Sequence, residues 1–137
     1  MNWYGYLNTL PVTPLWNTIA DIESQSKWRS DLSKVVVDKN QKQLVWTEYL
    51  KNNQQFTFRV KVKEEYSRFE IEIINNKNFS GCWIGLLQTI ENGYTEIDFT
   101  EVSIVQNPVF RLMSFLFFDL EKTVDLYISD LEKYLQN

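Results

Sequence analysis

Histidine is absent from the 137-residue chain, and cysteine occurs once, as Cys82. A lone cysteine excludes an intramolecular disulfide and the zinc sites built from paired Cys or from Cys and His. The lack of histidine also excludes a Ser-His-Asp or Cys-His nucleophile. A chain of this length buries roughly two-thirds of the surface that its unfolded form exposes, so its core needs no such staple. We expect one domain over residues 1–137, with no metal and no cofactor.

Glycine and proline are scarce, at 4 and 3 residues, which leaves no room for a low-complexity segment or a linker. The longest apolar stretch, Val109 to Leu120, is interrupted by charged and polar residues and is shorter than the roughly 20 residues of a membrane span. The first residues carry no positive charge and no long apolar run, unlike a signal peptide. We expect a soluble, cytoplasmic protein with no integral membrane segment, and leave transient membrane contact open.

Aromatic residues are abundant: 5 Trp, 7 Tyr and 9 Phe make up 15% of the chain. Such large rings need a core or a ligand cavity to cover them. The formal net charge is −4. A basic row of Arg59, Lys61 and Lys63 is partly neutralised by Glu70 and Glu72, so nucleic-acid binding is not expected.

Apolar spacing and turn residues predict the elements near the N-terminus. A strand over residues 3–10 ends at Pro11, and a helix follows with Thr13 as its N-cap and Pro14 at its first position. Its apolar face is Leu15, Trp16, Ile19 and Ala20. A second short helix begins at Ser24 or Ser26 and carries Trp28 and Leu32.

Six further strands with short polar turns predict antiparallel neighbours. We expect them at residues 34–38, 43–51, 55–64, 67–75, 79–91 and 94–105. A two-residue turn at Glu65 and Tyr66 predicts the pairs Val62 with Phe69, Val60 with Ile71, Phe58 with Ile73, Lys61 with Glu70, and Arg59 with Glu72.

The turn at Asn92 and Gly93 is the strongest hairpin signal in the chain. As a two-residue turn it pairs Leu86 with Phe99 and Gln88 with Ile97. This register favours Cys82, Ile84 and Leu86 as the inward residues, and only a bulge would bring Trp83 in with them.

The chain ends in a long predicted helix that follows Asn107 and Pro108 and runs to about Leu135. Its core face repeats at steps of three and four residues, at Met113, Phe117, Leu120, Val124, Tyr127, Ile128, Leu131 and Leu135. The first half is apolar beyond this row and must be covered by loops, a partner or a ligand, at Phe110, Leu112, Phe115 and Phe118.

The predicted order is a strand, two short helices, a run of antiparallel strands and a long C-terminal helix, which makes a two-layer α+β domain. A helix laid across a strongly curved sheet of about seven antiparallel strands does not fill the concave side by itself. The gap is crowded with large side chains or left as a cavity. This is the helix-grip arrangement.

Short motifs at both ends of the chain support this fold. Residues 15–21, followed by Trp28 and Arg29, form one group; residues 79–83 and 92–95, then Thr100, Glu101, Asn107, Pro108 and Arg111, form the other. These motifs resemble the START-like (SRPBCC) superfamily, which includes the Bet v 1 group, polyketide cyclases and dehydratases, and lipid transport proteins. The resemblance implies a helix-grip fold with a cavity for a hydrophobic molecule.

The candidate ligand-binding residues are those expected on the concave side of the sheet or the inner face of the last helix. They are Trp28, Trp46, Phe58, Val60, Ile71, Trp83, Leu86, Ile97, Phe99, Glu101, Met113, Phe117 and Leu120. For the three tryptophans, packing in the core is an equally good interpretation.

Glu101 stands out because period-two alternation sends it to the same side as Ile97 and Phe99. A carboxylate buried there needs a partner, for which Arg111 and Arg29 are the candidates. A structural ion pair is favoured over a catalytic acid. Glu48 and Tyr49 alternate on their strand, and the pattern leaves open which of them faces the cavity; the catalytic candidates are Glu101 and Tyr49.

Taken together, these features favour binding or transport of a small hydrophobic molecule, such as a lipid or a polyketide, without covalent chemistry. The first alternative is a cofactor-free enzyme of the cyclase or dehydratase type, in which a carboxylate with a raised pKa and a Tyr handle a proton next to a carbonyl. The second alternative is a protein-interaction module that docks through Phe115 and Phe118.

Overall fold

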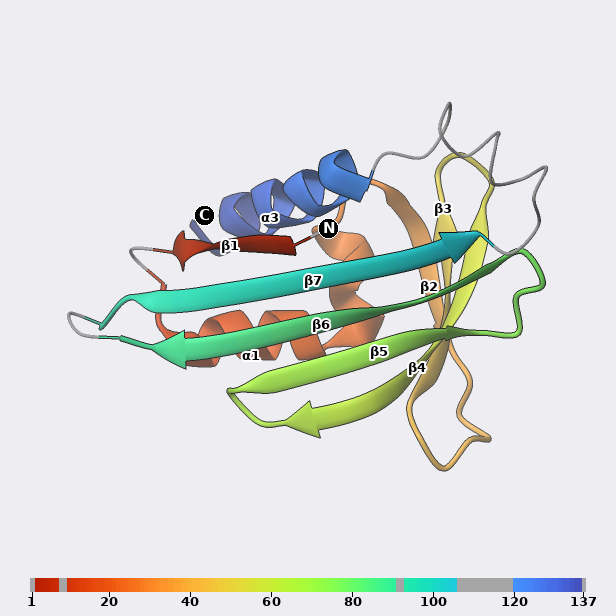
Figure 1. Cartoon of the computed structure of the whole chain (residues 1–137), viewed down its shortest axis with the longest axis horizontal. Helices are drawn as coiled ribbons and strands as arrows, with labels where there is room; N and C mark the ends of the chain where they lie inside the picture. Colours follow the sequence, from red (N-terminus) through yellow and green to blue (C-terminus); the bar gives the residue numbers. More distant parts are fainter. Residues whose placement is uncertain (1, 8–9, 91–92, 106–119, 137) are drawn as a thin grey trace.

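The computed structural model describes residues 2–7, 10–90, 93–105 and 120–136. Within these residues, one seven-stranded antiparallel sheet has the strand order β1-β7-β6-β5-β4-β3-β2 (Figure 1). The strands are β1 (Asn2–Leu7), β2 (Leu32–Val37), β3 (Val45–Leu50), β4 (Gln55–Glu64), β5 (Arg68–Ile74), β6 (Phe79–Thr89) and β7 (Thr95–Val105). The helices are α1 (Val12–Ala20), the 3-10 helix η1 (Ile22–Lys27) and α3 (Leu120–Gln136).

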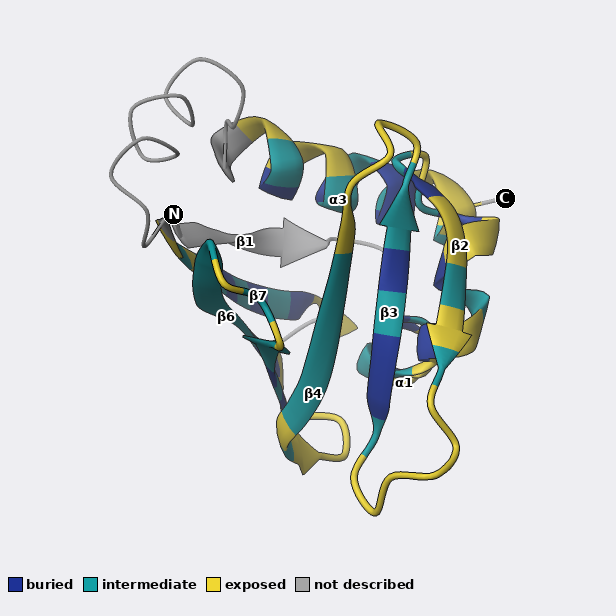
Figure 2. Cartoon of the chain, turned by 90° about the vertical axis from the view of Figure 1, so that its right-hand side faces the viewer, coloured by how far each residue is buried: buried dark blue, intermediate teal, exposed yellow. Residues whose placement is uncertain are grey.

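The sheet is curved, and α1 and α3 lie on its inner side, as the predicted two-layer α+β arrangement requires (Figure 2). The main core lies between this inner face and the two helices. Its fully buried side chains come from both layers and include Leu15, Ile19, Trp46, Phe69, Ile97, Phe99 and Leu131.

The two short helices differ in their bounds from the predicted ones. Helix α1 begins at Val12 after Pro11, so Thr13 is not its N-cap. Pro14 is the third residue of the helix, and it is tolerated there because the N–H groups of the first turn have no intrahelical acceptor. The second helix begins at Ile22, before Ser24, and ends at Lys27, so Trp28 is its C-cap and not a helical residue. At this end the N–H groups of Trp28 and Arg29 donate to the Gln25 carbonyl.

The hairpin of β4 and β5 matches the predicted register only in the half away from the turn. There Val60 pairs with Ile71. Nearer the turn, Val62 lies opposite Glu70, because Tyr66 has a φ of 67° in a three-residue connection and a bulge between Val60 and Val62 absorbs the extra residue. Lys61 is therefore not opposite Glu70, whose carboxylate instead forms an ion pair at 2.8 Å with Arg68, two residues before it on the same strand.

The register of β6 and β7 is shifted by one residue from the predicted one. Gly85, not Leu86, pairs with Phe99, and the Ile90 N–H donates to the Tyr94 carbonyl, so the connection is one residue longer than a two-residue turn. A shift of one residue exchanges the two faces of a strand. Trp83 consequently faces the core, while Leu86, predicted to bind ligand, is 39% exposed.

The last helix confirms the predicted core face over its described part. Val124, Ile128 and Leu131 are buried, and Tyr127 and Leu135 pack against them. The predicted helix start and the residues Asn107, Pro108, Phe110, Arg111, Leu112, Met113, Phe115, Phe117 and Phe118 lie outside the described residues, as does the side chain of Leu120. Over the described ranges, no helix has the length and apolarity needed to cross a membrane.

Candidate functional site

Two adjoining cavities lie between the inner face of the sheet and α3. An inner chamber of about 80 Å³ reaches the core. An outer pocket of about 420 Å³ extends toward the β3–β4 turn and the first turns of α3. The two share the lining residues Arg29, Glu48, Phe58, Glu101 and Thr123.

The two cavities differ in volume and therefore in what they can hold. A cavity needs roughly 10 to 15 Å³ to hold one water, so the inner chamber has room for a few small groups. Small-molecule pockets span about 300 to 1,000 Å³, and the outer pocket falls within this range. A ligand could therefore sit in the outer pocket and insert one end into the chamber.

The wall of the inner chamber is mostly aromatic and aliphatic. Trp46 and Phe58 stack with their ring centroids 5.7 Å apart. The ring centroid of Trp83 lies 4.9 Å from that of Phe99, which is buried in the core. A Cβ added at Gly85 would lie 2.6 Å from the Trp83 ring, so this close approach requires glycine. Further apolar lining comes from Ile19, Ile22, Phe69, Ile71 and Val124.

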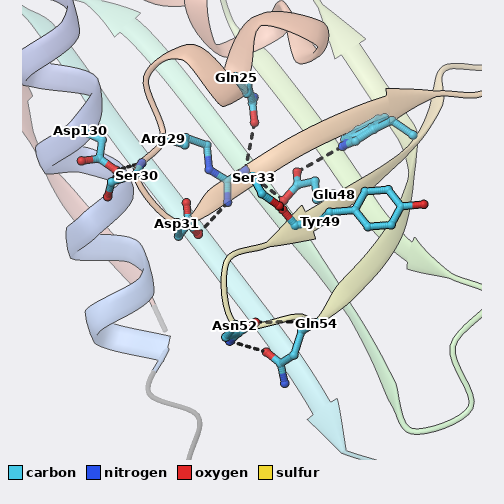
Figure 3. A network of polar contacts seen from close by, with 11 residues as sticks. Gln25, Arg29, Ser30, Asp31, Ser33, Glu48, Tyr49, Asn52, Gln54 and Asp130 are labelled. Atoms are coloured by element: carbon cyan, nitrogen blue, oxygen red, sulfur yellow. Dashed lines mark hydrogen bonds and ion pairs between the residues drawn. The ribbon is translucent and has the colours of Figure 1, made fainter.

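A polar cluster is centred on Arg29 (Figure 3) and lies where the two cavities meet, since Arg29 and Glu48 line both of them. Arg29 Nη1 donates to Glu48 Oε1 and to Gln25 Oε1, each at 3.0 Å, and Nη2 donates to Asp31 Oδ2 at 3.1 Å. Burial by itself would lower the pKa of Arg29, but the carboxylates of Glu48 and Asp31 raise it above its ordinary value. Arg29 is therefore a permanent cation.

Glu48, rather than Tyr49, is the member of its pair that faces the cavity. The Glu48 carboxylate accepts from Arg29 through one oxygen and from Trp46 Nε1, at 3.2 Å, through the other. Tyr49 lies on the other face, where the Lys34 ammonium is 4.6 Å from its ring centroid. Tyr49 is not among the lining residues of the two cavities, so its assignment as a catalytic candidate in the cavity is wrong.

Glu101 lines both cavities, on the side of the sheet that alternation predicted. Burial raises the pKa of its carboxyl to about 7, and the opposing charge of Arg29 only partly offsets this effect. Arg29 forms its ion pairs with Glu48 and Asp31, so it acts on Glu101 through its charge. Near neutral pH, the Glu101 carboxyl is therefore present in both its protonated and its ionised form, so it can donate or accept a proton.

Tyr127 is the lining residue whose importance the sequence did not indicate. It projects from α3 into the inner chamber, with the Arg29 guanidinium 5.4 Å from its ring centroid. Burial holds the pKa of its hydroxyl above the ordinary value, so the group stays protonated. Helical spacing predicted an inward position for Tyr127, but not its placement beside Arg29.

The other predicted ligand-binding residues divide into wall and core. Trp46, Phe58, Ile71, Trp83 and Glu101 line the inner chamber. Four others lie behind the wall: Trp28 packs against Tyr127 and Tyr134, Val60 packs at the edge of the core, and Ile97 and Phe99 are fully buried. In the part of the chain that the structure describes, no group of three or more acidic or thiol side chains could hold a metal ion.

No family model and no curated protein matches the sequence. Solved structures do match the fold. The ZhuI aromatase/cyclase from a Streptomyces species is 12% identical, with a TM-score of 0.76 and coverage of 99% of this chain and 92% of that one.

Two further structures extend this comparison. Norcoclaurine synthase from Thalictrum flavum is 5% identical, with a TM-score of 0.75 and coverage of 100% and 86%. A START superfamily protein from Mycobacterium smegmatis is 10% identical, with a TM-score of 0.69 and coverage of 99% and 96%. Identities this low are evidence about the fold alone. The chain therefore shares the helix-grip fold of these structures, and its sequence motifs resemble the START-like (SRPBCC) superfamily.

Proposed function

We propose that the protein binds a small, largely apolar molecule between the curved sheet and α3. The observation that carries this proposal is the pairing of an aromatic inner chamber with an outer pocket of about 420 Å³. Burial of apolar ligand surface is favourable by about 25 cal/mol for each Å². The polar cluster at the junction would fix the orientation of the ligand.

The ligand class that fits this proposal is a lipid, a polyketide or a molecule of similar character. The lining combines rings such as Trp46, Phe58 and Trp83 with a few polar groups, which suits a rigid or aromatic body with one polar end. We further propose that the protein is cytoplasmic and forms a single domain over residues 1–137. It would bind its ligand without nucleic acid, a metal or a cofactor.

Titration with the neutral fluorophore N-phenyl-1-naphthylamine tests the binding proposal. We expect saturable binding at one site, with a rise in emission as the dye leaves water. Thr123→Phe fills the junction of the cavities and should weaken binding, whereas Asp125→Phe, on the exposed side of α3, should leave it unchanged. A linear, unsaturable response of the folded protein would contradict the proposal.

Native mass spectrometry of protein purified from cells would identify the physiological ligand class. We expect a bound small molecule that is released on denaturation and is mainly apolar. A released molecule that is highly charged and lacks an apolar body would count against the proposed class.

A second candidate function, a cyclase-type enzyme, is favoured by Glu101. A carboxyl group whose pKa is about 7 can remove a proton next to a carbonyl at neutral pH. Tyr127 lines the same chamber and would be the tyrosine of this mechanism, because Tyr49 lies on the other face of the sheet. Deuterium exchange at the carbons next to the carbonyl of a bound ketone, followed by NMR in D₂O, tests this function; exchange that is equally fast with Glu101→Gln would exclude Glu101 as the base.

The third class, an interaction module that docks through Phe115 and Phe118, concerns residues outside the described ranges and stays a prediction. Pull-down of a protein partner that is lost with Phe115→Ser and Phe118→Ser, while dye binding is retained, would favour it over a ligand carrier.

A further inference from the structure

Arg29 carries a buried hydrogen-bond donor for which the described residues supply no acceptor. Its Nη1 and Nη2 atoms donate to Gln25, Glu48 and Asp31. Its Nε–H is buried and has no acceptor among the residues that the structure describes. Buried polar groups are nearly always hydrogen-bonded in native proteins. Because Arg29 lines both cavities, the missing acceptor can arrive with a ligand.

Tyr127 provides a second donor in the same chamber. Its ring lies against the Arg29 guanidinium, at 5.4 Å, and it lines the inner chamber. Its hydroxyl stays protonated, because burial raises its pKa, and a phenolic O–H can donate. Two donors on neighbouring side chains can converge on one oxygen, which has lone pairs for both.

The charge around Arg29 decides which kind of oxygen fits. Glu48 and Asp31 already compensate the guanidinium, at 3.0 and 3.1 Å. Glu101 lines the same space and is partly ionised near neutral pH. A ligand carboxylate would add another negative charge beside these groups, which is unfavourable in a poorly solvated site. A neutral carbonyl accepts the same hydrogen bonds without added charge.

We infer that the ligand carries a neutral carbonyl oxygen, such as that of a ketone, which accepts hydrogen bonds from Arg29 Nε and the Tyr127 hydroxyl. The inference rests on the proposed binding function and narrows its ligand class. The apolar body of the ligand then extends along Phe58 toward the outer pocket, which Phe58 also lines.

Three probes of nearly equal shape test this inference: 2-acetylnaphthalene, 2-ethylnaphthalene and 2-naphthoate. Their affinities are measured by displacement of N-phenyl-1-naphthylamine. The hydrocarbon is the more apolar probe, so burial alone would favour it over the ketone. We expect the ketone to bind about tenfold more tightly than the hydrocarbon, the equivalent of one ordinary hydrogen bond, and the carboxylate to bind most weakly.

Tyr127→Phe is the decisive variant, because it keeps the ring and removes only the hydroxyl. Arg29 itself is unsuitable, since its replacement would also break the ion pairs with Glu48 and Asp31. We expect Tyr127→Phe to reduce the preference for the ketone severalfold and to leave hydrocarbon affinity unchanged. Tyr134→Phe, at an exposed position of the same helix, is the matched control and should change neither affinity.

Infrared spectroscopy of the bound ketone, with the carbonyl labelled with ¹³C, gives a readout that is independent of affinity. We expect the carbonyl stretch to lie below its frequency in a hydrocarbon solvent and to rise with Tyr127→Phe. Equal affinities for ketone and hydrocarbon, tightest binding of the carboxylate, or an unchanged stretch in the variant would overturn the inference and leave the binding proposal intact. Absence of saturable binding of all probes, including the fluorophore, would overturn both.

Discussion

The Arg29 guanidinium lies 5.4 Å from the ring centroid of Tyr127, and this contact joins the segment before β2 to α3. The neighbouring Ser30 donates its N–H and its hydroxyl to Asp130 on the same helix, at 2.7 and 2.8 Å. Arg29 also pairs with Glu48 on β3. One short segment therefore connects the sheet to the helix at the cavity, so the side chains that shape the cavity also hold the two layers together.

Loss of the Glu48 carboxylate is expected to destabilise the fold. Glu48→Ala leaves the buried Arg29 charge and the Trp46 N–H without this acceptor, and should lower the free energy of unfolding by about 3 to 5 kcal/mol. Glu72→Ala removes the partner of the more exposed Arg59 and should cost under about 1 kcal/mol. Urea denaturation of both variants measures the difference, and similar losses would contradict the structural role of Glu48.

Glu101 is expected to make stability fall with rising pH. Its pKa in the folded protein is about 7, above the ordinary value of 4.5. Between these values the folded state keeps a proton that the unfolded chain has lost, so stability decreases through this window and its contribution is constant on either side. Glu101→Gln should therefore gain stability relative to wild type as the pH rises from about 4.5 to about 7. Urea denaturation across this range tests the sign, and a difference independent of pH would show that the Glu101 carboxyl titrates normally.

Gly85→Ala is expected to disturb the inner chamber. The new methyl group would overlap the Trp83 ring, at 2.6 Å, and would touch Phe99, at 3.2 Å. Because Trp83 forms part of the chamber wall, its displacement should weaken dye binding and cost about 1 to 3 kcal/mol of stability. Tryptophan fluorescence and dye titration measure the two effects. Unchanged binding with an unchanged spectrum would show that the ring has room to move without altering the chamber.

Wall and core positions are expected to respond differently to truncation. Leu131 is fully buried, so Leu131→Ala should cost about 2 to 5 kcal/mol while leaving ligand affinity nearly unchanged. Phe58 is half-buried and lines both cavities, so Phe58→Ala should weaken dye binding more than it lowers stability. Chemical denaturation and dye titration of both variants provide the comparison. The same ratio of binding loss to stability loss in both would mean that Phe58 is ordinary core.

The alternation and spacing of apolar residues determined the element order, the antiparallel sheet and the core face of the last helix. These features are local, because the pleat of a strand and the turn of a helix assign faces to neighbouring residues. The position of Glu101 on the inner face follows from such alternation along β7. The same reasoning succeeded for Val60 and Ile71, far from the turn of their hairpin.

Only the tertiary structure decided the registers near the turns. Tyr66 adopts a positive φ, and the connection after Ile90 is one residue longer than the Asn92-Gly93 motif predicted. Each difference is small along the chain, but a shift of one residue reverses a strand face and so exchanged Leu86 for Trp83 at the inner side.

The polar site also depended on the tertiary structure. Arg29, Glu48 and Tyr127 come from three distant segments, and their contacts arise when the curved sheet closes around α3. Sequence spacing assigns each of these residues a face on its own element. It does not determine which side chains from different elements meet, because sheet curvature and helix packing set those distances.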